Sequence, residues 1–181
     1  MDKNDERAAR QLLDRQEIYD CLLRYTRGMD RLDPDSVISA FHPDASANGG
    51  TREELAAGGV AMHSEENRYT QHCLTNHYCE LDGDLANAET YFVYFGARER
   101  EATDVLGGRY IDEFERRDGE WRLSKRIVLV EWSSSLPLGK DIGTSPSTDA
   151  PEAMNDPRSR RSREDASYIR PLPVNTVSSL A

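Results

Sequence analysis

The first part of the chain carries apolar residues at helical spacing. Between Asp5 and Met29 they recur every three or four positions, and polar residues fill the opposite face. This pattern predicts one long amphipathic helix that packs against a broad apolar surface. Gly28 loosens the end of this helix, and Asp30 lies where the pattern stops.

Two shorter helices are expected to follow. Asp33 is a favourable N-cap, and Pro34 fits the first helical position. Thr51 and, three residues later, Glu54 form the capping-box pattern. A short strand is expected between these helices, over residues 45–48. The two helices are predicted to cover residues 34–41 and 51–63.

From Tyr69 onward the pattern changes to one typical of strands. Long segments rich in Tyr, Phe, Val and Thr are separated by short turns that contain Gly. Strands of this length must bend, and a bent sheet has a concave face that can hold a ligand. The fold class predicted is α+β, with a strongly curved antiparallel or mixed sheet wrapped around the long helix. The predicted strands cover residues 70–81, 86–100, 107–117 and 120–131.

The character of the chain changes after about Ser135. The remaining residues include six of the eight prolines, together with many Ser and Asp residues. Such a segment does not build a second core. We therefore predict a barrel domain over residues 1–135 and an extended tail over 136–181, packed on the barrel or on a neighbouring subunit.

Charge and composition exclude several classes of function. The formal net charge of −10 argues against nucleic-acid binding, which needs a basic face. The basic run over 158–163 lies in the tail, where a solvated or salt-bridged stretch is expected. No apolar window is long enough for a membrane helix, and the N-terminus does not resemble a signal peptide. The three cysteines show no CxxC spacing, which is typical of a reduced protein, so a cytoplasmic location is expected.

His72 and Asp30 are the candidate catalytic residues. Strand alternation places His72 and Asn76 on one face and His77 on the other. Asp30 ends the long helix, where an anion needs a cationic partner. A carboxylate that holds one imidazole nitrogen leaves the other nitrogen free to take a proton from a substrate. No nucleophile motif is present, so the pair indicates proton abstraction rather than covalent catalysis.

Other side chains are expected to line the pocket. Because Arg126 lies among apolar residues, an anionic partner is expected, either a carboxylate or a developing negative charge. The sequence shows no metal-ligand spacing and no nucleotide-binding glycine motif, so neither a metal nor a cofactor is predicted. The predicted substrate-binding residues are Tyr25, Arg126, Asn76, Tyr94 and Tyr110.

Several segments resemble the SnoaL-like, nuclear-transport-factor-2-like superfamily. The opening segments 14–30 and 41–45 resemble those of SnoaL-like proteins. The strand from Thr70 to Asn76, and the closing segments 107–110 and 115–126, resemble the scytalone dehydratase and hexachlorocyclohexane dehydrochlorinase group. The resemblance covers residues 8–134. It implies a cone-shaped barrel, no cofactor, and a homo-oligomer in which a trimer is favoured over a dimer.

The resemblance also implies site residues and an activity. Asp30 and His72 match the positions of the catalytic pair, and Arg126 matches an arginine near the dehydrochlorinase pocket. Tyr25 stands where the dehydrochlorinase has a lysine, a departure from the pattern of that enzyme. The expected function is a cofactor-independent lyase that releases water, halide or formaldehyde from a small hydrophobic, aromatic substrate. The alternatives are an isomerase or cyclase, a non-catalytic ligand-binding module, and the small subunit of a ring-hydroxylating dioxygenase.

Overall fold

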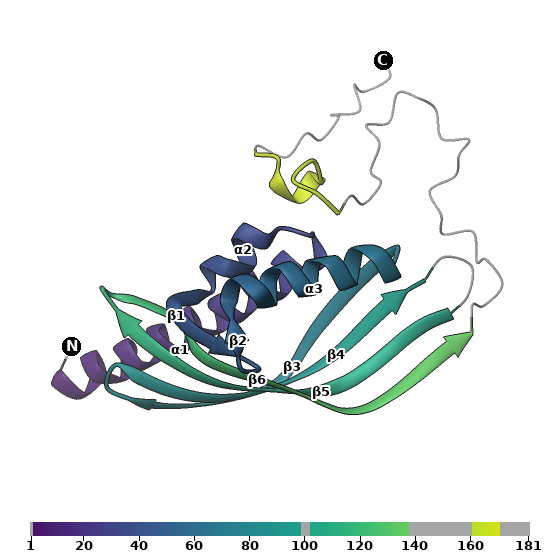
Figure 1. The fold of residues 1–181 in the computed structure, drawn as a ribbon. Helices are drawn as coiled ribbons and strands as arrows, with labels where there is room; N and C mark the ends of the chain where they lie inside the picture. Colours follow the sequence, from purple (N-terminus) through teal and green to yellow (C-terminus); the bar gives the residue numbers. More distant parts are fainter. Residues whose placement is uncertain (1, 99–101, 138–160, 171–181) are drawn as a thin grey trace, which may run out of the picture.

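The computed structural model describes residues 2–98, 102–137 and 161–170. Three α-helices lie on one side of a curved six-stranded sheet, and the segment 161–170 lies beyond the helices (Figure 1). The sequence therefore predicted the α+β class and the curved sheet correctly. Within the described residues, no helix combines the length and apolarity that crossing a membrane requires.

Helix α1 (Lys3–Asp30) begins at Asp2, whose side chain accepts hydrogen bonds from the backbone of Asn4 and Asp5. Its apolar stripe enters the core only in the second half of the helix, while Leu12 and Leu13 remain exposed. Gly28 is needed where α1 meets the next helix, because a Cβ there would lie 2.8 Å from the Val37 side chain. The end of α1 is therefore held close to the following segment.

Helix α2 (Pro34–Ser39) begins after the Asp33 N-cap as predicted, but it is shorter than expected. Strand β1 (Phe41–Ala47) begins four residues earlier than the predicted strand and pairs in parallel with the last strand. Pro43 lies between Phe41 and Ser46, where the register between β1 and the last strand is irregular. A missing N–H is tolerated at such a position.

Helix α3 (Arg52–Glu66) begins with the predicted capping box of Thr51 and Glu54. It follows the two-residue strand β2 (Gly50–Thr51), which pairs with β1. Gly59 faces the end of α1, because a Cβ there would lie 2.7 Å from the methyl carbon of Met29. The C-terminal halves of α1 and α3 are thus in close contact.

Four long strands complete a sheet with the order β2-β1-β6-β5-β4-β3, in which only β1 and β6 are parallel. Tight turns connect β3 to β4 and β5 to β6, with Gly83, Asp118 and Gly119 at positive φ. Irregular pairing interrupts β3 and the β5–β6 pair, and such bulges bend a sheet. The strands are β3 (Tyr69–Asp82), β4 (Leu85–Ala97), β5 (Ala102–Arg117) and β6 (Glu120–Pro137).

Candidate functional site

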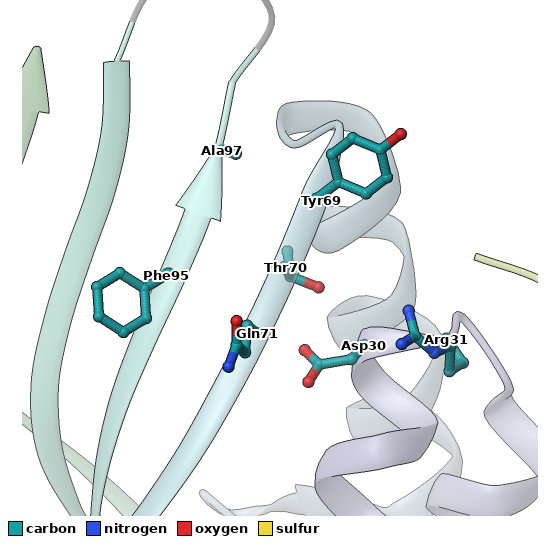
Figure 2. Close-up of a pocket in the computed structure, with 7 residues that line it drawn as sticks. All are labelled: Asp30, Arg31, Tyr69, Thr70, Gln71, Phe95 and Ala97. Carbon is teal, nitrogen blue, oxygen red and sulfur yellow. The ribbon is translucent and has the colours of Figure 1, made fainter. Parts of the chain in front are cut away.

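Asp30 and His72 meet where the end of α1 lies beside the edge strand β3. The Nδ1 atom of His72 lies 2.7 Å from Oδ1 of Asp30, and the His72 backbone N–H donates to Oδ2 at 2.9 Å. The His72 backbone N–H can make this hydrogen bond because an edge strand has N–H groups that no neighbouring strand uses. Figure 2 shows the carboxylate directed from α1 toward β3 beside Thr70.

Two opposed effects set the charge of Asp30. Burial raises its pKa, but the hydrogen bonds from the His72 ring and backbone outweigh burial, so the pKa lies below the ordinary value. Asp30 is therefore a carboxylate near neutral pH, and it stabilises a positive charge on the imidazole. Among the described residues, Asp30 is the only hydrogen-bond partner of the His72 ring, which leaves Nε2 available.

A second histidine, His63, lies against this pair. Its Nδ1 atom lies 3.2 Å from the Tyr94 hydroxyl, and its ring meets the His72 ring edge to face at 5.3 Å between centroids. The Tyr94 ring lies 4.9 Å from the His72 ring. Burial, the neighbouring His72 and Arg161 lower the pKa of His63 to about 4, although Asp30 opposes the shift.

His63 was not among the residues predicted for the site. The signal that could have identified it is the buried face of α3, because Ala56 and His63 are seven positions apart, which places them on one face of a helix. Gly59 lies between them and faces α1.

Arg161, from the C-terminal segment, caps the ends of two helices at this site. Its Nε donates to the backbone oxygen of Asp30 at 3.2 Å, and its Nη1 donates to those of His63 and Asn67 at 2.7 and 2.8 Å. Its Nη2 also donates to the Thr70 hydroxyl at 3.0 Å. Asp30 ends α1, and His63 lies in the last turn of α3, so the guanidinium satisfies carbonyls that the helices leave unpaired.

Other residues of the segment 161–170 attach it to the same end of the barrel. Arg163 bonds to Asp33 and Asp35, and the Tyr168 hydroxyl donates to Asp33 at 3.0 Å. The guanidinium of Arg27 lies 4.0 Å from the centre of the Tyr168 ring. Arg161 and Arg163 of the basic run are thus engaged with the barrel, whereas residues 158–160 lie outside the described part of the chain.

A pocket of about 290 Å³ opens beside the Asp30 carboxylate at the edge of the sheet (Figure 2). Asp30 is the one residue of the predicted site that lines this pocket. The pocket is lined by Asp30, Arg31, Tyr69, Thr70, Gln71, Phe95 and Ala97.

Tyr25, Tyr110 and Arg126 lie together deeper in the barrel. Arg126 donates to both oxygens of Asp112 at 2.7 Å, and its guanidinium lies 4.2 Å from the centres of the Tyr25 and Tyr110 rings. Burial lowers the pKa of Arg126, but Asp112 outweighs this effect and the pKa is raised. Phe92 stacks on Tyr110 at 4.5 Å. The anionic partner of Arg126 is thus a carboxylate of the neighbouring strand.

The prediction that Asn76 faces the pocket is wrong. The β3–β4 register shifts between Leu74 and His77, and the extra residue reverses the alternation. Asn76 is consequently exposed, whereas His77 faces inward and bonds to the buried Thr90 at 2.8 Å. His72 and His77 therefore share a face of the strand, contrary to the expectation from simple alternation.

Comparison with solved structures shows where this fold recurs. A scytalone dehydratase candidate from Novosphingobium aromaticivorans is 19% identical, with a TM-score of 0.62 over 72% of this chain and 96% of that chain. A type 2 hexachlorocyclohexane dehydrochlorinase is 23% identical, with a TM-score of 0.61 over 70% of this chain and 90% of that chain. The type 3 dehydrochlorinase from Novosphingobium barchaimii is 22% identical, with a TM-score of 0.60 over 70% and 92%. At these identities the likeness shows the fold.

Sequence comparison identifies the family. No curated protein sequence matches the chain. The model of the SnoaL-like domain matches residues 10–127, which is more than half of the chain. These residues run from α1 into β6 and include Asp30, His63 and His72. The chain belongs to the SnoaL-like domain family.

Proposed function

We propose that the protein is a cofactor-independent lyase that uses His72 as a general base. The observation that carries the proposal is the double attachment of Asp30 to His72, through ring Nδ1 and through the backbone N–H. This attachment fixes the ring and directs its remaining nitrogen away from the carboxylate. The similar structures include a dehydratase candidate and dehydrochlorinases, which agrees with elimination chemistry.

In the proposed reaction, Nε2 of His72 takes a proton from a carbon atom of the substrate. The electron pair of the broken C–H bond forms a C=C bond, and the leaving group departs with its own bonding pair. The Asp30 carboxylate stabilises the imidazolium that results. In the loss of formaldehyde, the base instead takes a hydroxyl proton, and the O–H electron pair forms the C=O bond of formaldehyde. The pair of the broken C–C bond stays on the substrate carbon, which takes the proton back from His72.

The aromatic surroundings of the pair support a small aromatic or hydrophobic substrate. The Tyr94 ring packs against His72, and Phe95 lines the neighbouring pocket. Tyr25, Tyr110 and Arg126 remain predicted substrate-binding residues. Because they pack against one another, they would form the floor of a cavity rather than its entrance.

The test is a mass-spectrometric screen of the purified protein, without added cofactor, against aryl alcohols, diols, halides and hydroxyketones. We expect a product lighter by water, hydrogen halide or formaldehyde. The product should be absent with His72→Ala and strongly reduced with Asp30→Asn, while His77→Gln serves as the matched control on the same strand. Product without a change of mass would indicate an isomerase, and activity that survives in His72→Ala would refute the proposed base.

A further inference from the structure

The site contains two neighbouring imidazole rings that are held in the same way. His72 is held through Nδ1 by Asp30 at 2.7 Å, and His63 is held through Nδ1 by the Tyr94 hydroxyl at 3.2 Å. The two rings are 5.3 Å apart and nearly perpendicular, with an interplanar angle of 83°. Among the described residues, the structure shows no hydrogen bond to Nε2 of either ring, so each ring has one nitrogen available to a ligand.

The groups that hold the two rings differ in charge. Asp30 holds the His72 ring with a carboxylate, whereas Tyr94 holds the His63 ring with a neutral phenol. Within the described part of the chain, the charged and titratable groups that face His63 are His72, Asp30, Arg161 and Tyr94. Burial, together with the neighbouring His72 and Arg161, outweighs Asp30 and keeps the pKa of His63 at about 4. His63 is therefore neutral near pH 7.

The position of the single proton on His63 follows from its partner. A phenol is a far stronger acid than the N–H of a neutral imidazole, so the better hydrogen bond runs from the Tyr94 hydroxyl to Nδ1. The proton of the ring is then on Nε2. A buried neutral imidazole with this tautomer is a hydrogen-bond donor that does not lose or gain charge over the physiological range.

We propose that His63 is a second substrate-contacting residue of this site, whose Nε2–H donates a hydrogen bond to the atom that becomes negative when His72 removes the proton. The inference rests on the proposed lyase function and narrows its substrates. A neutral imidazole offers a hydrogen bond rather than a full proton. It therefore suits an enolate oxygen or a departing halide, and it does not suit a hydroxide that must leave as water in the same step.

The kinetic test compares two substitutions of one residue. Gln places an amide N–H near the position of Nε2, and Leu removes every donor. Loss of a donor to a developing anion reduces kcat by about 100-fold to 1,000-fold. We expect this loss in His63→Leu with KM nearly unchanged, and recovery to within about tenfold of wild type in His63→Gln. The control is His77→Gln, since His77 is also held through Nδ1 but bonds to Thr90.

A spectroscopic test is independent of turnover. Histidine labelled with nitrogen-15 reports the tautomer and charge of each ring, and His63→Gln identifies the signal. We expect His63 to be the neutral Nε2–H form at about pH 6, near the usual histidine pKa. An Nδ1–H tautomer or an imidazolium at that pH would overturn the proposal, even in an active enzyme.

The outcomes separate the inference from the function on which it rests. Suppose that the wild type is active, that His72→Ala is inactive, and that the kcat of His63→Leu is within about threefold of wild type. This result would support the lyase function and refute the role of His63. An equal reduction of kcat in His63→Leu and His63→Gln would also refute this role, as would a higher KM with unchanged kcat. A wild type without turnover, or an active His72→Ala, would instead refute the proposed function itself, and the role of His63 with it.

Discussion

The buried ion pair of Arg126 and Asp112 provides a quantitative test of what stabilises the inside of the barrel. Neither side chain has exposed surface, and two hydrogen bonds of 2.7 Å join them. Replacing Asp112 by Asn leaves the guanidinium charge in the core without a countercharge. Breaking a buried pair in this way costs about 3–5 kcal/mol of unfolding free energy. This is a large part of the roughly 5–15 kcal/mol by which a domain is stable.

The matched control removes both charges at once. Arg126→Met combined with Asp112→Leu keeps most of the side-chain volume, and such replacements are often neutral or stabilising. Urea unfolding measures the free energy of unfolding of the wild type, of Asp112→Asn, of the single variants Arg126→Met and Asp112→Leu, and of the double variant. We expect each single variant to lose several kcal/mol and the double variant to recover most of the loss. An Asp112→Asn variant within about 1 kcal/mol of wild type, or a double variant less stable than both single variants, would refute the reasoning.

The same double variant tests the predicted role of Arg126 in binding. If Arg126 only holds the barrel together, the refolded double variant keeps its turnover. If its guanidinium contacts the substrate, turnover is lost although stability is restored. Nη1 of Arg126 is buried and has no partner among the described residues, so it is the nitrogen of this side chain that a substrate could engage.

Four further predictions concern the site and the C-terminal segment. The folded state keeps the pKa of His63 at about 4, while in the unfolded chain the pKa has its ordinary value. The free energy of unfolding should therefore fall by up to about 3 kcal/mol as the pH drops from about 6.5 to 4. A pH series of urea unfolding measures this fall, and an equally steep fall in His63→Gln would contradict the prediction. Arg161→Ala should speed hydrogen exchange in residues 161–170 and lower the melting temperature by several degrees, whereas unchanged exchange would show that Arg161 does not hold the segment. Deletion of residues 140–181 should lower thermal stability or shift the oligomeric state, and no change in either would contradict a packed tail. Asp30→Asn should keep the fold by circular dichroism but reduce kcat about 10³-fold to 10⁴-fold, and full activity would exclude Asp30 as the partner of the base.

The sequence predicted those elements whose patterns are local and long. Helix α1 and the four long strands carry their periodicity over many residues, and the tight turns have glycines where positive φ occurs. The start of β1 was missed because its parallel pairing with β6 joins residues that are far apart in the chain. The exposed position of Asn76 was missed because a bulge depends on the neighbouring strand, which simple alternation does not include.

Some residues of the candidate site could likewise be predicted from local sequence patterns, and others could not. Asp30 and His72 were predicted from a helix end, a strand face and a resemblance to a family, and the structure places them 2.7 Å apart. His63 could have been found from the buried face of α3. Arg161 had no comparable signal, because it belongs to a proline-rich segment without periodicity and contacts residues about a hundred positions away.

The convergence of two helix ends explains why these particular side chains meet. Helix C-termini carry partial negative charge on unpaired carbonyls, and α1 and α3 both end at this corner of the barrel. Asp30 adds a full negative charge there, so the corner needs cations. Arg161 supplies one by binding carbonyls of both helices, and a protonated His72 supplies another when it takes a proton. The helix end that is an unfavourable position for the Asp30 anion is therefore also the position that brings its carboxylate into contact with the His72 ring.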